Sequence, residues 1–139
     1  MENGTTITVE TTVNATIEKV WAFWTLPQHI TKWNNASGDW HTPFASNDLQ
    51  EGGKFVSTMA AKDGSFSFNF SGTYDIILTL QKITYTLDDN RKVSIHFTVE
   101  TGTVKVVETF EPEMENTIEL QQLGWQAILN NFKLYIEAN

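Results

Sequence analysis

Glu108 is the titratable residue with the most unusual sequence environment, because it stands in phase with Val106 and Phe110 on the apolar face of a predicted strand. A carboxyl group that faces an apolar interior loses hydration, which raises its pKa and suits it to act as a general acid or base. The alternative is a β-bulge or a shifted register, which would turn the side chain toward solvent. The sequence leaves both interpretations open.

Tyr74, Tyr85 and His41 are the other candidates for proton transfer or ligand binding. Each tyrosine hydroxyl could bond the polar end of a ligand, or could lie at the edge of a packed core. His41 follows Asp39 by two residues, a spacing that suits a base with its orienting carboxylate, a pair of metal ligands, or simple capping of a loop. No third ligand stands at a matched spacing, so we expect no metal site.

Composition excludes several classes of function. The chain has 139 residues, a formal charge of −8, nine basic residues and no cysteine. One domain over residues 1–139 fits this length. The negative charge disfavours nucleic acid and anionic membranes, and no stretch reaches membrane-spanning length. The absence of cysteine fits a reducing compartment, so we expect a cytoplasmic protein. No phosphate loop or dinucleotide motif is visible, and we expect no cofactor.

Period-two alternation of apolar and polar residues, which is typical of half-buried strands, recurs along most of the chain. It predicts six strands at residues 7–13, 54–62, 66–80, 83–87, 92–100 and 103–110. Turn residues between the last five predict an antiparallel meander. The inward-facing set is expected to be Phe55, Ser57, Met59, Phe68, Phe70, Tyr74, Ile83, Tyr85, Leu87, Val93, Ile95, Phe97, Val104, Val106 and Phe110.

Helical spacing of apolar residues predicts three helices. The first follows an N-cap at Thr16, and Pro27 ends it and opens a short second helix that closes at Trp33. The third, of about twenty residues, is capped by Asn116 or Thr117. Its apolar stripe comprises Trp125, Ile128, Leu129, Phe132, Tyr135 and Ile136.

The segment 34–53 is rich in Asn, Ser, Gly and Pro, and we predict a loop there. Trp33 and Trp40 flank its first part. Two exposed indole rings would be costly in water, so we expect them to fold over the open end of the sheet as a lid.

An aromatic sheet face opposite an aromatic helix predicts either a filled core or a pocket for an apolar molecule. The sequence does not decide between them. If a pocket exists, its lining is expected to be Trp33, Trp40, Phe55, Met59, Phe68, Phe70, Tyr74, Tyr85, Phe97, Glu108, Phe110, Trp125, Ile128, Leu129 and Phe132.

Several short motifs occur in a distinctive order along residues 5–136. They are Val20-Trp21, Trp33, Gly52-Gly53-Lys54-Phe55, Gly72-Thr73-Tyr74 and Gly124-Trp125. Together with the order of elements, they resemble the START-like helix-grip superfamily, and within it the homologues of the activator of the heat-shock-protein-ninety ATPase. The resemblance implies an α+β fold in which a six-stranded curved antiparallel sheet wraps around a long C-terminal helix, with two short helices between the first two strands.

The resemblance also implies a function, since many members of the superfamily hold a small apolar molecule between helix and sheet. We therefore expect binding of a small apolar or aromatic ligand. One alternative is a cyclase-like acid–base enzyme that uses Glu108, His41 or Tyr74 in the same cavity. Another is a chaperone-interaction module. We expect a monomer or a weak dimer, with an exposed first strand leaving dimerisation open.

Overall fold

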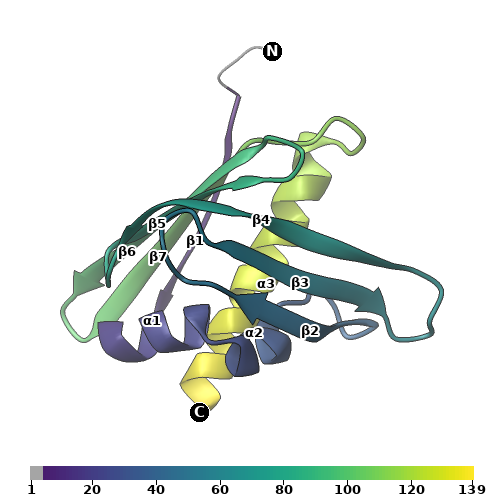
Figure 1. Cartoon of the computed structure of the whole chain (residues 1–139). Helices are drawn as coiled ribbons and strands as arrows, with labels where there is room; N and C mark the ends of the chain where they lie inside the picture. The colour runs from purple at the N-terminus through teal and green to yellow at the C-terminus, as the bar shows by residue number, and fades with distance from the viewer. Residues whose placement is uncertain (1–4) are drawn as a thin grey trace.

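Seven antiparallel strands form one sheet in the computed structural model, which describes residues 5–139. The spatial order is β1-β7-β6-β5-β4-β3-β2. The strands are β1 (Ile7–Val13), β2 (Trp40–Asn47), β3 (Lys54–Ala61), β4 (Ser67–Leu78), β5 (Lys82–Leu87), β6 (Lys92–Glu100) and β7 (Thr103–Phe110). The helices are α1 (Ile17–Thr25), α2 (Pro27–Trp33) and α3 (Ile118–Ala138). Figure 1 shows the curved sheet lying across α3, with α1 and α2 near one end of that helix.

The α+β class, the two short helices after the first strand and the long final helix are confirmed, but the strand count of six was wrong. The additional strand is β2, which lies inside the segment predicted as a loop. Its sequence hides the period-two pattern because Pro43 interrupts it and the register with β3 shifts between His41 and Phe44. Proline is tolerated there because β2 is the edge strand of the sheet.

The helix boundaries follow the predicted capping residues. Thr16 accepts a hydrogen bond from the Lys19 amide at 3.2 Å, and Pro27 occupies the first turn of α2. Of the two candidate caps for α3, Thr117 is the one that accepts from a helix amide, that of Leu120, at 3.1 Å. These bonds satisfy backbone donors that have no partner within the helix.

One face of α3 forms the centre of the core. Leu129, Phe132 and Ile136 are wholly buried on it. Polar residues on a neighbouring face bind the first strand: the Gln126 amide donates to the Glu10 carbonyl at 3.0 Å, and Lys133 Nζ donates to the Thr12 carbonyl at 2.6 Å. These bonds fix α3 alongside β1. No helix within residues 5–139 combines the length and apolarity needed to cross a membrane.

The alternation in β4 holds only part of the way along the strand. Phe68 pairs with Met59 and lies on the inner face as predicted, yet 45% of its surface is exposed. The register with β5 then shifts between Tyr74 and Ile76. This bulge turns Ile76 to an exposed position, although it is two residues from the buried Tyr74.

Candidate ligand-binding site

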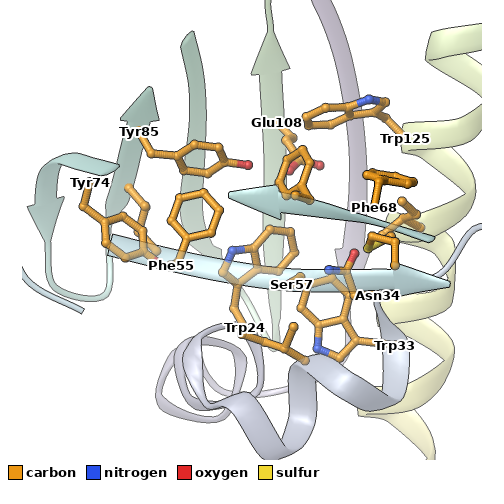
Figure 2. Close-up of a pocket in the computed structure, with 15 residues that line it drawn as sticks. Trp24, Trp33, Asn34, Phe55, Ser57, Phe68, Tyr74, Tyr85, Glu108 and Trp125 are labelled. Carbon is orange, nitrogen blue, oxygen red and sulfur yellow. The ribbon is translucent and has the colours of Figure 1, made fainter. Parts of the chain in front are cut away.

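A cavity of about 200 Å³ lies between α3, the two short helices and the inner face of the sheet (Figure 2). Aromatic side chains predominate in its walls, and none of the lining residues that belong to the described range 5–139 is basic. The lining residues are Trp24, Ile30, Trp33, Asn34, Phe55, Ser57, Met59, Phe68, Phe70, Tyr74, Ile83, Tyr85, Glu108, Trp125 and Ile128. The sequence allowed either a pocket or a filled core between the helix and the sheet, and the structure contains a cavity there.

Ten of the fifteen residues expected from the sequence line this cavity, and five do not. Phe110 lies behind Trp125, with the two rings stacked at a centroid distance of 3.7 Å. Phe97 packs edge-on against the Trp21 and Trp24 rings. Three other expected residues do not line the cavity. Leu129 and Phe132 are wholly buried on the side of α3 that faces the core, and Trp40 lies on β2.

Five lining residues were missing from the expected set. Ser57 and Ile83 had been placed on the inward face but not assigned to the site. Trp24, Ile30 and Asn34 come from the two short helices and the residue that follows them. The apolar stripe of α1 contained the signal for Trp24. The packing of α1 and α2 against the mouth of the sheet was not visible in the sequence.

Glu108 faces the cavity, and β7 is regular around it. Its backbone pairs in register with Val9 on one side and Ile95 on the other, so the bulge considered above is not there. Only 7% of the residue is exposed. Among residues 5–139, no hydrogen bond or ion pair reaches its carboxyl group, and burial alone raises its pKa to about 8. The group is therefore largely a neutral acid at pH 7.

The Tyr85 hydroxyl is the polar group that Figure 2 shows pointing toward the Glu108 carboxyl. Its ring is held by Phe55, with the centroids 4.7 Å apart. Burial raises the pKa of Tyr85 well above its ordinary value, and the neighbouring Glu108 carboxyl adds to that rise. Glu108 and Tyr85 thus bring two polar groups to the same apolar wall, from strands β7 and β5.

Tyr74 uses its hydroxyl within the fold. It donates to Asn47 Oδ1 at 2.6 Å, and Asn47 Nδ2 donates in turn to the Thr25 carbonyl at 2.6 Å. This chain of bonds joins β4, β2 and the end of α1. Burial raises the pKa of Tyr74. Its ring lines the cavity, but its hydroxyl is occupied by a structural bond.

The predicted lid of two tryptophans is wrong. Trp33 is 4% exposed, donates from its indole nitrogen to the Phe23 carbonyl at 2.9 Å and packs on Phe132. It therefore belongs to the core as well as to the cavity wall. Trp40 is part of β2 and lies edge-on to Phe66 and Phe68 outside the cavity. Pairing of this segment as a strand supplies its backbone hydrogen bonds, which a mobile lid would lack.

His41 and Asp39 do not form a catalytic pair at the cavity. His41 is exposed on β2, and neither residue lines the cavity. Asp39 accepts a hydrogen bond from Ser37, which lowers the pKa of its carboxyl. His96 is exposed on β6 and does not line the cavity either. Within residues 5–139, no cluster of three His, Asp or Glu side chains is placed to hold a metal ion.

The comparisons with known proteins agree with this architecture. The family model described as "Activator of Hsp90 ATPase homolog 1-like protein" matches residues 14–137. The chain belongs to this family. An AHSA1-like protein from Aeromonas hydrophila, solved by NMR, is 44% identical, with a TM-score of 0.90 over 96% of this chain and 93% of that one. No curated protein matches the chain.

Two other solved structures are similar to this AHSA1-like chain over nearly its whole length. A protein from Cytophaga hutchinsonii is 58% identical, with a TM-score of 0.84 over 98% of this chain and 94% of that one. A protein from Chromobacterium violaceum is 20% identical, with a TM-score of 0.84 over 98% of this chain and 100% of that one, which shows the fold alone.

Four of the five motifs that suggested the AHSA1-like family contribute a residue to the cavity wall. Trp33, Phe55, Tyr74 and Trp125 all line it. Gly72 lies where β4 passes close to β5, and a Cβ atom at this position would come within 2.5 Å of the Thr86 carbonyl oxygen and 3.2 Å of the Phe55 ring. Only glycine allows this approach, so Gly72 sets how deeply the Phe55 ring can sit.

Proposed function

We propose that this AHSA1-like chain binds a small, mainly aromatic molecule in the cavity between α3 and the sheet. One observation carries the proposal: the cavity of about 200 Å³ is enclosed mostly by aromatic rings and has a buried carboxyl group in its wall. An apolar cavity of about 150 Å³ holds benzene in another protein. The space therefore fits one aromatic ring with a short substituent.

The arrangement of the walls supports entry of such a molecule from one side. Phe68, at 45% exposed, is the most exposed of the lining residues, and Asn34 and Ile128 near it are partly exposed, which favours an entrance between β4, the end of α2 and α3. Ile83 and Glu108 are buried deeper in the wall. A ligand would enter with its polar group toward Glu108 and leave its apolar end near the mouth.

Binding of 2-phenylethanol, followed by calorimetry and by the thermal unfolding temperature, tests the proposal. We expect a dissociation constant between micromolar and millimolar, or roughly −4 to −8 kcal/mol. Ile128→Trp should fill the space and abolish binding. Leu134→Trp, on the same helix but 69% exposed, is the matched control and should bind normally. Unchanged binding by Ile128→Trp would overturn the proposal, and so would failure of the unmodified protein to bind both 2-phenylethanol and the amine of the same shape, 2-phenylethylamine.

A second candidate function is acid–base catalysis on a ligand in this cavity. It is favoured by Glu108, whose pKa of about 8 is suited to proton transfer near neutral pH. His41 and the Tyr74 hydroxyl contribute little to this candidate, because the first lies outside the cavity and the second is bonded to Asn47. Loss of turnover in Glu108→Gln with ligand binding retained would identify an enzyme.

A chaperone-interaction role is supported only by the family's description. Co-precipitation with the purified chaperone would test it directly. A cytoplasmic location and a monomeric or weakly dimeric state are likewise proposals from the sequence, and native mass spectrometry of the purified protein would measure the second. The same measurement would detect any small molecule that co-purifies.

A further inference from the structure

We propose that the ligand of this cavity is an organic cation, with an apolar body among the aromatic rings and an ammonium group against Glu108. The inference rests on the proposed binding function and adds the charge of the ligand. It comes from three features of the site: a carboxyl group without a partner, walls made of aromatic rings, and a lining without any basic residue.

The unpartnered carboxyl group is the first feature. A buried ionisable group normally has a hydrogen-bond or charge partner, because desolvation without compensation is costly. Glu108 is more than nine-tenths buried, because only 7% of its surface is exposed. Even so, no hydrogen bond or ion pair among residues 5–139 reaches its carboxyl group. A cationic donor on the ligand would supply the missing partner, whereas a carboxylate or phosphate on the ligand would be repelled once Glu108 ionises.

Within the described part of the chain, residues 5–139, the groups around Glu108 contain no competing cation. Val9 of β1 and Ile95 of β6 lie beside it in the sheet, and α3 presents Trp125 and Ile128 to the cavity. The titratable residues that line the cavity from the other strands are Tyr85 on β5 and Tyr74 on β4, and the Tyr74 hydroxyl is bonded to Asn47. Arg91 acts on Tyr85 only from a distance, and its guanidinium is paired with Asp89 at 2.8 Å.

The aromatic walls are the second feature. Eight of the fifteen lining residues are Trp, Tyr or Phe. The negative face of an aromatic ring attracts cations, and cages of such rings are used to recognise ammonium groups. The charge of the whole chain, −8, acts in the same direction by raising the local concentration of cations and lowering that of anions.

Binding of a cation would ionise Glu108, and this coupling makes the proposal measurable. The proton that leaves the carboxyl group passes to the buffer. Because the pKa of the empty site is about 8, the apparent affinity for a cation should rise about tenfold per pH unit between pH 6 and pH 7.5. The affinity for a neutral ligand of the same shape should not rise with pH.

The experiment compares 2-phenylethylamine, which is an ammonium ion at these pH values, with 2-phenylethanol by calorimetry at several pH values and in buffers of different ionisation enthalpy. At pH 7 we expect the amine to bind on the order of tenfold more tightly than the alcohol. In Glu108→Gln that preference should disappear, together with proton release. Glu100→Gln makes the same substitution at an exposed position outside the cavity and should keep both.

Three results would overturn the proposal while leaving the binding function intact: the alcohol binds at least as tightly as the amine, the amine affinity is independent of pH, or Glu108→Gln retains the preference. The pH series on the unmodified protein decides the question even where the variant fails to fold. Failure of both probes to bind would overturn the proposed function itself.

Discussion

Replacement of Glu108 by glutamine should change how the stability of the empty protein depends on pH. The pKa of Glu108 is raised from its ordinary value of 4.5 to about 8 in the folded state. Below pH 4.5 the group is protonated in both states and favours neither. Between these two values it is ionised only in the unfolded chain, so the free energy of unfolding falls as pH rises.

The size of the effect follows from the two pKa values. One pKa unit corresponds to about 1.4 kcal/mol, so the free energy of unfolding should fall by that amount per pH unit and by about 5 kcal/mol in total by pH 8 and above. A typical domain has only about 5–15 kcal/mol in all. Ionisation of this one buried carboxyl group would therefore remove a large part of the free energy of unfolding at alkaline pH.

Urea unfolding of the unmodified protein and of Glu108→Gln at pH 5, 6, 7 and 8 measures this effect. Other titrating groups contribute equally to both proteins, so the difference between the two free energies isolates Glu108. We expect the free energy of unfolding of Glu108→Gln, measured relative to that of the unmodified protein, to increase steadily as pH rises. A difference that stays constant from pH 5 to pH 8 would refute the reasoning, because it would mean that Glu108 is hydrated or already paired in the folded state.

Three further substitutions test the core and the backbone by urea unfolding. Phe132→Ala should lower the free energy of unfolding by about 3–5 kcal/mol, and Leu134→Ala on the exposed side of α3 by less than about 0.5 kcal/mol; similar losses would contradict the helix-grip core. Gly124→Ala should raise stability by about 0.5–1 kcal/mol, because its Cβ meets open space in a helix. Gly72→Ala should lower it by about 1–3 kcal/mol through the clash with the β5 backbone, and a neutral effect would refute that contact.

Local patterns predicted most of the elements and part of the site. The alternation in β3, β5, β6 and β7 predicted which residues are buried, and the caps at Thr16 and Thr117 bound the helices. These predictions succeeded because they depend on the neighbours of a residue in the chain. The edge strand β2 was missed because Pro43 and an irregular register remove the alternation, and only pairing with β3 makes it a strand.

The sequence by itself determined which residues turn toward the interior, because side chains on a strand alternate and those on a helix recur every three to four residues. It put Glu108 in phase with the apolar residues of its strand but left open whether a bulge turns it outward, and the regular pairing of β7 with β1 and β6 decided that. Tertiary structure alone decided that the interior is not filled. That outcome depends on how α1 and α2 pack Trp24 and Trp33 against the mouth of the sheet, and on how Phe110 lies behind Trp125. The volume between packed elements is set by distances across the fold, which local periodicity does not encode.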